Sequence, residues 1–271
     1  MSPKFVNDNK NLIKLIRRFE ELGSAVVAFS GGVDSALLVA ASHLVLGNEK
    51  MVAITVDSHS LPDDDRKRVA RFCSDLSIPH EFVAGTEFED EKFLSNSSDR
   101  CYFCKKHLYS LLMNVAERYN FKYVVEGTNS SDMTGHRPGA KAAFEFERVV
   151  QPLKELGLDK AEVRKLAKAL NLKEADKPAT ACLSSRIPFG TKISHERLLL
   201  VDKAESYLKQ LGIKKVRVRD HDKIARIEVD DESFAIVLNQ REEILKMLAA
   251  LGWHHITLDL GGYSPAIPHK E

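Results

Sequence analysis

A glycine-rich turn between a short apolar strand and a helix constrains the fold of this chain more than any other segment. Residues 24–30, SAVVAFS, are apolar and include β-branched side chains, which is typical of a buried strand. Residues 36–47, ALLVAASHLVLG, have the length and apolar content of a buried helix. The turn that joins them contains SGGVDS at 30–35. A strand, a tight turn and a helix in this order predict the first half of a βαβ unit.

The alternation of strands and helices continues along the first two thirds of the sequence. We expect further strands at 51–58, 80–85 and 122–129, a short ambiguous segment at 149–153, and helices at 4–23, 63–78, 101–120 and 159–172. Strands that are separated by helices of this length pair in parallel, because the helix must cross over the sheet. The pattern therefore predicts an α/β fold with a mostly parallel sheet covered by helices on both faces.

The pattern changes after residue 175. The segment 176–194 is rich in Pro, Gly, Ser and Thr and has no periodicity, which is typical of a linker or a functional loop. Beyond it we expect a helix, two strands, a helix and a strand at 195–212, 214–220, 223–229, 232–252 and 254–260. This order predicts a smaller α+β domain with an antiparallel sheet. We therefore expect one domain at 1–175, the functional loop at 176–194 and a second domain at 195–271.

Composition excludes several classes of protein. The 40 Lys and Arg residues nearly balance the 39 Asp and Glu residues, so the net charge of +1 gives no overall attraction to a nucleic-acid backbone. No apolar run reaches the roughly 18 residues that a membrane-spanning helix needs. The N-terminal segment lacks the apolar core of a signal peptide. We expect a soluble, cytoplasmic protein that binds neither membranes nor nucleic acid.

The SGGVDS turn has the features of a phosphate-binding loop. Gly31 and Gly32 permit positive φ and a close approach of the backbone to an anion, and the helix that follows offers N–H groups at its positive end. Ser30 and Ser35 add hydroxyl donors. The segment matches neither the Walker pattern nor the dinucleotide pattern. Asp34 suits such a loop if it binds a Mg²⁺ ion that bridges phosphates; the alternative is an ordinary Gly-Gly turn.

The cysteines indicate metal, cluster or redox chemistry. Cys101 and Cys104 have C-x-x-C spacing at the start of an expected helix, so both thiols can lie on one face. Cys182 lies in the loop before the second domain. Cys73 lies beside Phe72 and Leu76 on the expected helix at 63–78, where we expect a buried structural thiol. Two alternatives are a closed zinc site completed by His107 and a redox pair formed by the C-x-x-C cysteines.

A basic pattern occurs on the expected strands of the second domain. Lys215, Arg217 and Arg219 alternate and project on one face, and Arg226 and Glu228 do the same on the next strand. One interpretation is a solvated face with salt bridges. The other is a binding site for a substrate that carries a phosphate and carboxylates.

Together these motifs resemble a known family. SGGVDS after an apolar strand is similar to the pyrophosphate loop of the PP-loop ATPases, which split ATP between the α and β phosphates and adenylate a substrate oxygen. The chain from about residue 10 to residue 265 resembles the LarE family in EGTNSSD (126–132), RPG (137–139), PLKELGLDKAEVRKLAKAL (152–170), KPATACLSSRIPFG (177–190), VRVRDHDKIARIEV (216–229) and ITLDLGGY (256–263). LarE proteins transfer sulfur to pyridinium-3,5-biscarboxylic acid mononucleotide during nickel-pincer nucleotide biosynthesis, which serves lactate racemase maturation.

The resemblance implies roles for individual residues. Asp57, Ser58 and Gly127 would help bind ATP, together with the phosphate loop. The resemblance places Arg186, Arg217, Arg219 and Glu228 at the substrate, and Glu205 is a further candidate. Asp132 and Arg137 are expected near the catalytic edge of the sheet, although turn and cap chemistry would also explain them.

The resemblance also implies two possible sources of sulfur. Some LarE proteins sacrifice the sulfur of one loop cysteine, here Cys182. Others hold a [4Fe-4S] cluster with three cysteines, and this chain has that set in Cys101, Cys104 and Cys182. Three thiolates leave the fourth iron open for an extra sulfide, which would attack the adenylated carboxylate. Asp34 and Cys182 are therefore our candidate catalytic residues, with ATP, Mg²⁺ and the cluster as cofactors.

The implied activity is an ATP-dependent sulfur transfer that converts a substrate carboxylate to a thiocarboxylate and releases AMP and pyrophosphate. We expect a sulfide source such as a cysteine desulfurase as a partner, and a homo-oligomer. One rival is a tRNA thiolase, which the charge balance and the missing RNA-binding appendage oppose. An amidating synthetase would leave the three cysteines unexplained, and a nucleotide sensor would have no use for Cys182.

Overall fold

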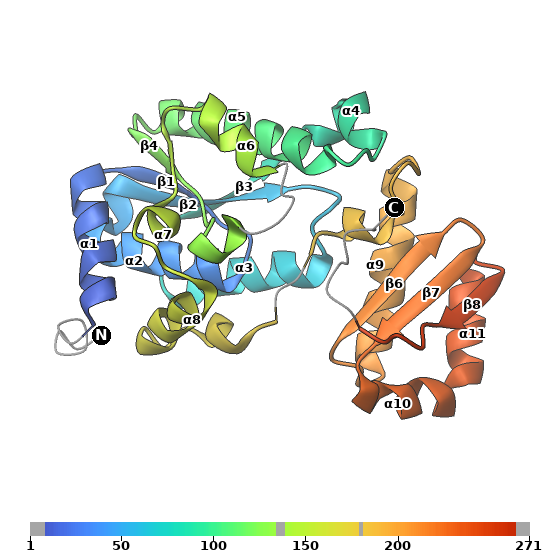
Figure 1. The fold of residues 1–271 in the computed structure, drawn as a ribbon. Coiled ribbons are helices and arrows are strands. Elements are labelled where there is room, and N and C mark those ends of the chain that lie inside the picture. The colour runs from blue at the N-terminus through green and yellow to red at the C-terminus, as the bar shows by residue number, and fades with distance from the viewer. Residues whose placement is uncertain (1–8, 134–138, 179–180, 264–271) are drawn as a thin grey trace. The chain divides into compact units, whose positions relative to one another are not determined.

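The computed structural model describes residues 9–133, 139–178 and 181–263. They form two compact units (Figure 1). The first unit comprises Met1–Ser58, Asp65–Asp90 and Ser98–Thr180, and the second comprises His59–Asp64, Glu91–Ser97 and Ala181–Glu271. Two short segments from the first part of the sequence thus belong to the second unit. Arg137 lies outside the described residues.

A five-stranded parallel sheet organises the first unit, as predicted. Its strands are β1 (Ala25–Ala28), β2 (Met51–Asp57), β3 (His80–Ala84), β4 (Tyr123–Val125) and β5 (Val149–Val150), in the order β3-β2-β1-β4-β5. The chain leaves β1 toward β2 on one side and returns to β4 on the other. The strand order therefore reverses between β1 and β4, and parallel sheets bind their ligands at the carboxyl ends of the strands at such a point.

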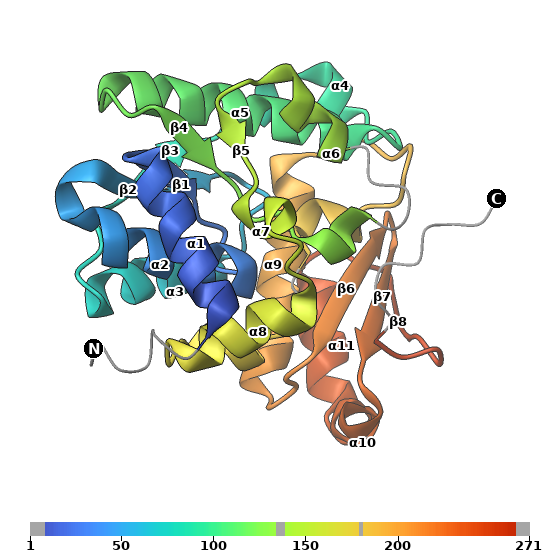
Figure 2. The same ribbon diagram turned by 60° about the vertical axis from the view of Figure 1, so that its left-hand side comes forward.

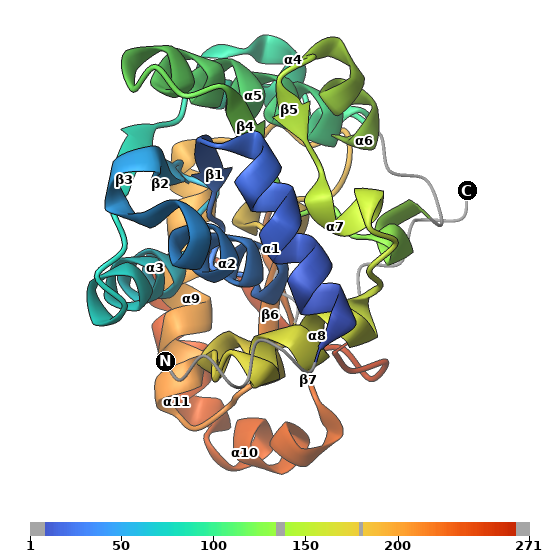
Figure 3. The same cartoon turned by 90° about the vertical axis from the view of Figure 1, so that its left-hand side faces the viewer.

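Helices cover both faces of this sheet, as Figure 3 shows. One face carries α1 (Lys10–Leu22), α2 (Val33–Lys50), α3 (Asp63–Asp75) and α8 (Lys160–Ala169), whose apolar side chains form one core with β1. The other face carries α5 (Arg100–Arg118), which packs on Val26, Val52 and Val124. All four residues of β1 are apolar, as expected for a strand that helices cover on both faces.

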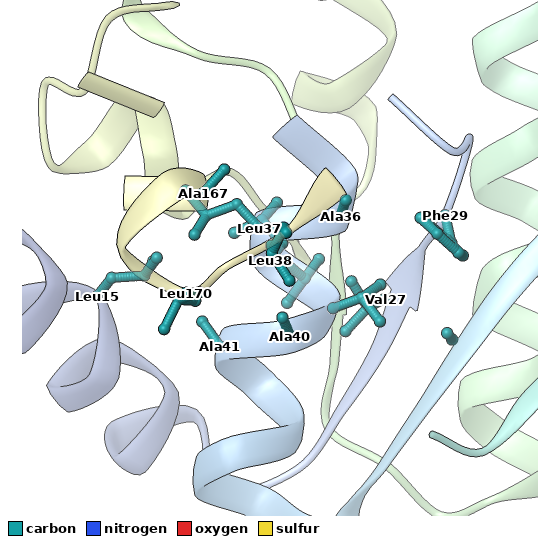
Figure 4. Close-up of a cluster of buried hydrophobic side chains, with 14 of the residues drawn as sticks. Leu15, Val27, Phe29, Ala36, Leu37, Leu38, Ala40, Ala41, Ala167 and Leu170 are labelled. Carbon is teal, nitrogen blue, oxygen red and sulfur yellow. The ribbon is translucent and has the colours of Figure 1, made fainter. Parts of the chain in front are cut away.

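The main core surrounds α2, the helix that follows the glycine-rich turn. Figure 4 shows Leu15 from α1, Val27 from β1 and Leu170 from the end of α8 around the apolar residues of α2. The α2 helix is buried on most of its surface, since it lies between the sheet and α1 and α8. Hydrogen bonds from Asn11 to Glu162 and from Arg18 to Glu155 also link α1 to the segment containing α7 (Pro152–Glu155) and α8 (Figure 2). The turn before α2 is therefore held by a fully packed helix.

Short elements complete the description. The remaining short α-helices are α4 (Glu91–Leu94), α6 (Gly139–Ala142) and α7 (Pro152–Glu155). The 3₁₀ helices are η2 (Glu87–Glu89), η3 (Ser130–Met133), η4 (Ala143–Glu145), η5 (Lys173–Asp176), η6 (Leu183–Arg186) and η7 (Asp231–Ser233). The segment 176–194, predicted to have no regular period, accordingly contains only the short η6 and the end of η5 among its described residues.

The second unit contains a three-stranded sheet with helices. Its elements are α9 (His195–Gln210), β6 (Val216–His221), β7 (Ile224–Val229), α10 (Phe234–Asn239), α11 (Arg241–Ala250) and β8 (His255–Leu258). The strands β6 and β7 form the predicted hairpin, but β8 pairs with β7 in parallel. The prediction of an antiparallel sheet is therefore wrong for β8. The two helices between β7 and β8 carry the chain back across the sheet, and such a crossover produces parallel pairing.

The predicted helix at 232–252 is also broken into separate pieces. The chain forms η7, then α10, and then α11, with Gln240 between the two α-helices at φ −105° and ψ 18°. In the described part of the chain, no helix is both long and apolar enough to cross a membrane.

Candidate functional site

The turn after β1 presents backbone N–H groups at the start of α2. Gly31 has a φ of +71°, and Gly32 is the N-cap residue of α2. The hydroxyl of Ser35 accepts a hydrogen bond from the Ser30 N–H at 3.2 Å and donates to the Gly32 carbonyl at 3.0 Å. The N–H groups of a first helical turn have no partner within the helix and carry partial positive charge. The turn therefore has the backbone geometry of an anion site, as its sequence predicts.

Gly31 in this turn and Gly127 beyond β4 are both closely packed. A Cβ atom at Gly31 would lie 2.7 Å from Cγ1 of Val69, and the positive φ would also strain it. Gly127, which follows β4, would place a Cβ atom 3.3 Å from both the Asp34 Cβ and the Ser35 N. Gly127 thus lies against the phosphate loop. The segments after β1 and β4 meet where the strand order reverses.

Asp34 is held by two side chains from other segments. Its Oδ1 accepts a hydrogen bond from Asn129 Nδ2 at 3.0 Å, and its Oδ2 forms an ion pair with Lys160, the first residue of α8. Sequence reasoning missed both partners. Lys160 lies inside a capping pattern that Asp159 and Glu162 explain fully by themselves. A partner 126 residues away in the chain gives no local signal.

The segment after β4 combines an ion pair to a buried carboxylate with turn chemistry. Glu126, only 2% exposed, accepts hydrogen bonds from Lys105 Nζ at 2.9 Å and Gln151 Nε2 at 2.6 Å. Burial alone would raise the pKa of Glu126, but the Lys105 ammonium and the hydrogen bonds hold that pKa below its ordinary value. Asp132 accepts a hydrogen bond from the Asn129 N–H at 3.1 Å, which is the cap chemistry named above as its alternative explanation.

Asp57 and Ser58 lie at the carboxyl end of β2. Asp57 forms an ion pair with Arg66, and the Ser58 hydroxyl donates to the carboxylate of Glu87. Gly85 completes this corner, because a Cβ atom there would lie 2.5 Å from Glu87 Oε2 and 3.2 Å from Ser58 Cβ. The carboxyl ends of β1, β2 and β4 therefore lead into the phosphate loop, the Asp57–Ser58 corner and Gly127, respectively. All of the residues predicted to bind the nucleotide lie at one edge of one sheet.

The four cysteines have different surroundings. Cys73 is 2% exposed, and burial raises the pKa of its thiol to about 12, in agreement with the predicted structural role. Cys101 is exposed and Cys104 is half-buried, and both lie near the start of α5. Cys182 is exposed and precedes η6 in the second unit. Among the described residues, no three His, Cys, Asp or Glu side chains are arranged to hold a metal ion.

His107, the zinc ligand considered above, has other partners. Its Nδ1 lies 3.2 Å from the Thr86 hydroxyl and its Nε2 lies 3.0 Å from Asp90 Oδ2. Both ring nitrogens are therefore within hydrogen-bond distance of polar side chains in the first unit, and a metal would have to displace one of them.

In the second unit, Arg186 links the Cys182 segment to helix α9. Its guanidinium forms a two-point ion pair with Glu205, with Nε and Nη2 at 2.7 and 3.1 Å from the carboxylate oxygens. Both side chains are almost fully buried. Arg186 Nη1 also donates to the Ala181 carbonyl at 3.0 Å, and that carbonyl directly precedes Cys182. Burial alone would lower the pKa of Arg186, but the charge of Glu205 holds it above its ordinary value.

The polar face of the second sheet carries the other candidate arginines. Arg219 forms a two-point ion pair with Glu228 on β7, at 2.8 and 3.0 Å, and donates to the Ser185 carbonyl at 2.7 Å. Arg217 is 5% exposed, and its guanidinium carbon lies 4.4 Å from the centre of the Tyr263 ring. Burial lowers the pKa of Arg217, and the charges of Arg186 and Arg219 lower it further. The structure thus brings Arg186, Arg217, Arg219 and Glu228 together. Tyr263, which contacts Arg217, was not predicted as a site residue, although it is the last residue of the segment ITLDLGGY (256–263) named above.

Comparisons with known proteins agree with this geometry. Residues 4–136 match the PP-loop domain family. An uncharacterized Synechocystis protein is 39% identical over 90% of this chain and 91% of its own length. Pyridinium-3,5-bisthiocarboxylic acid mononucleotide synthase of Lactiplantibacillus plantarum is 33% identical over 92% of this chain and 90% of its own length. An uncharacterized protein of Methanocaldococcus jannaschii is 29% identical over 94% of this chain and 97% of its own length.

These likenesses extend through both units. The chain therefore belongs to the LarE family of ATP-dependent sulfur transferases, which is built on a PP-loop domain.

Proposed function

We propose that this enzyme converts the carboxylates of pyridinium-3,5-biscarboxylic acid mononucleotide to thiocarboxylates at the expense of ATP. The observation that carries the proposal is the gathering of Arg186, Arg217 and Arg219 beside the backbone of the Cys182 segment. A mononucleotide with a phosphate and two carboxylates suits a site rich in guanidinium groups, because their positive charge and N–H donors attract oxyanions. The product of this reaction appears in the name of the L. plantarum relative.

In the first step the phosphate loop would bind ATP. The N–H groups at the start of α2 and the hydroxyls of Ser30 and Ser35 support binding of the leaving pyrophosphate. Asp34 offers the carboxylate oxygens that Mg²⁺ prefers, and the metal would neutralise charge on the phosphates. Lys160 now neutralises Asp34. We propose that Lys160 turns from Asp34 to a phosphate oxygen when ATP binds.

The reaction then proceeds by adenylation of a substrate carboxylate, because a free carboxylate is a poor electrophile. A substrate carboxylate oxygen attacks the α phosphorus, which forms an O–P bond, breaks the bond to the β phosphate and releases pyrophosphate. A sulfide nucleophile then forms a C–S bond at the acyl carbon, and the C–O bond to AMP breaks. The guanidinium groups of Arg217 and Arg219 would hold the substrate anions and stabilise negative charge during both steps. Two rounds would yield the bis-thiocarboxylate.

The donor chemistry of three cysteines fits a [4Fe-4S] cluster. Thiolates are the ligands of such clusters, and Cys101, Cys104 and Cys182 are at least partly accessible, whereas Cys73 is buried. We assign the cluster to these three residues; when bound, it would supply an open iron position that presents sulfide. The hydrogen-bond partners of His107 argue against the closed zinc site.

The test is an anaerobic assay with substrate nucleotide, ATP, Mg²⁺ and sulfide, with iron content measured on the same samples. The wild type should bind iron and form more than one product per chain. We expect Cys101→Ala, Cys104→Ala and Cys182→Ala to lose both properties, whereas Cys73→Ala keeps them. If only Cys182→Ala is inactive and the wild type stops after one turnover, Cys182 is the sacrificial sulfur donor. Full repeated turnover in an iron-free wild type refutes the cluster.

The proposal also assigns roles to the parts of the chain. Residues 1–175 would activate ATP, 195–271 would bind the nucleotide substrate, and the loop at 176–194 would contribute the Cys182 thiol. A cysteine desulfurase or a similar source would supply the sulfide, and we propose that the enzyme is a homo-oligomer. If the protein were a tRNA thiolase, RNA should remain bound to it through heparin chromatography. An ultraviolet spectrum of the eluted protein without a nucleic-acid contribution would argue against that alternative.

A further inference from the structure

A cavity of about 460 Å³ opens in the first unit between α3 and the segment around η5. Its volume lies within the range of small-molecule sites, about 300–1,000 Å³. None of the residues assigned above to ATP, to the nucleotide substrate or to the cysteine set lines it. The cavity is therefore separate from the roles proposed so far.

The cavity combines an apolar wall with an excess of cations. Phe72, Leu76 and Leu172 supply apolar surface, and the lining is mostly apolar overall. Four cationic side chains face two carboxylates, those of Asp75 and Glu174. The cations are Arg68, Arg71, Lys173 and Lys177. A cavity of this composition favours an organic anion, because the body of the ligand gains apolar contact while its charges meet the cations.

The four cations fall into an outer pair and an inner pair. Arg71 and Lys173 are exposed at the rim and form no ion pair with any residue in the described parts of the chain. Arg68 and Lys177 are half-buried and share Asp65, at 2.7 and 3.6 Å. The rim pair can thus bind an anionic group without breaking an existing ion pair. The inner pair can exchange Asp65 for a second anionic group.

The inner pair also contacts the phosphate loop. A Cβ atom at Gly31 would lie 3.3 Å from Nη2 of Arg68, and Lys177 Nζ donates a long hydrogen bond of 3.5 Å to the Gly31 carbonyl. A ligand that draws both cations into the cavity would remove these contacts from Gly31. The loop would then be held less firmly in the geometry that binds phosphate.

We propose that this cavity binds a small aromatic dianion and that its occupancy weakens ATP binding at the phosphate loop. An aromatic body matches the wall formed by Phe72, Leu76 and Leu172, and two separated charges match the rim and inner pairs of cations. The coupling is reciprocal, so ATP weakens binding of the dianion by the same factor. Neither statement depends on the proposed sulfur-transfer chemistry.

The test uses naphthalene-1,5-disulfonate as the probe and the full-length protein in isothermal titration calorimetry. Wild type should bind one probe per chain. Arg71→Glu combined with Lys173→Glu should weaken binding at least tenfold, and Asp75→Asn should strengthen it. Arg241→Glu, an equivalent charge reversal on the exposed α11, should leave it unchanged. Failure of the wild type to bind, or equal affinity in the Arg71/Lys173 variant, overturns the site.

The coupling is measured by ATP titration without any sulfur substrate. Saturating probe should weaken ATP binding by the wild type about fivefold or more, the lower end of ordinary allosteric couplings. In the Arg71/Lys173 variant, ATP should bind as tightly as in the wild type, and the probe should no longer affect it. If the probe weakens ATP binding equally in both proteins, it competes at the ATP site itself and the proposed coupling is wrong.

Discussion

Replacing Glu205 by leucine should strongly destabilise the second unit. The carboxylate of Glu205 accepts two hydrogen bonds from Arg186 and one from the Val218 N–H at 3.0 Å, and both charged side chains are 5% exposed or less. Glu205→Leu would leave a buried guanidinium with backbone carbonyls and the Ser185 hydroxyl as its partners. Removing one member of a buried ion pair costs about 3–5 kcal/mol. We expect a loss in the free energy of unfolding within that range.

The assay can follow this unit selectively. The chain has one tryptophan, Trp253, which lies in the second unit and is 3% exposed, so its fluorescence during denaturant unfolding reports on that unit. The control is Glu91→Gln, which removes an exposed pair with Lys192 and should cost less than about 1 kcal/mol. Arg186→Met combined with Glu205→Leu should recover most of the stability, since no uncompensated charge remains. A loss in Glu205→Leu no larger than in the control would refute the reasoning.

Three further results are expected. Lys160→Met should weaken ATP binding at least severalfold in a direct titration with Mg²⁺, because the bound phosphates then lose the ammonium group that turns to them from Asp34; unchanged affinity would contradict a role for Lys160 at the phosphates. The Lys105–Glu126 pair should stabilise the fold fully at pH values above the ordinary pKa of the carboxyl, near 4.5, and this contribution should disappear as the pH falls through the lower pKa of Glu126 in the folded protein. Glu126→Gln should therefore reduce the loss in the free energy of unfolding at acidic pH. An unchanged loss at acidic pH would contradict this role of the pair. In cluster-free native protein, iodoacetamide should label all cysteines except Cys73, as mass spectrometry would show; rapid native labelling of Cys73 would contradict its buried, protonated state.

Local signals were sufficient for much of the first unit. The strand, turn and helix around 30–35 could be predicted because each is determined by apolar patterning and by residues that permit a tight turn. The carboxyl ends of β1, β2 and β4 meet because parallel strands share one edge, and this explains why Asp57 and Gly127, which the family resemblance implied, lie at the same edge as the phosphate loop. Such features need no knowledge of distant contacts.

The direction of a strand and the ion pairs between segments distant in the sequence could not be predicted in this way. Alternation of apolar and polar residues marks 255–258 as a strand, but the pattern is the same for parallel and antiparallel pairing, and the direction of β8 depends on how α10 and α11 return the chain. The ion pair between Asp34 and Lys160 and the one between Arg186 and Glu205 depend on the tertiary fold. Each partner has an ordinary local explanation, such as a helix position, that hides its role.

The charge of the arginine cluster distinguishes the two interpretations that its sequence left open. In a structural network of salt bridges, carboxylates match guanidinium groups and the network is closed. Here Glu205 pairs with Arg186, Glu228 pairs with both Arg219 and Arg226, and Asp259 also pairs with Arg226. Arg186 and Arg219 nevertheless lie close enough to Arg217 for their charges to lower its pKa. Burying like charges together is unfavourable unless an anion offsets them. The burial of Arg217 beside Arg186 and Arg219 therefore favours an anionic ligand at this face of the sheet over a fully solvated face of ion pairs.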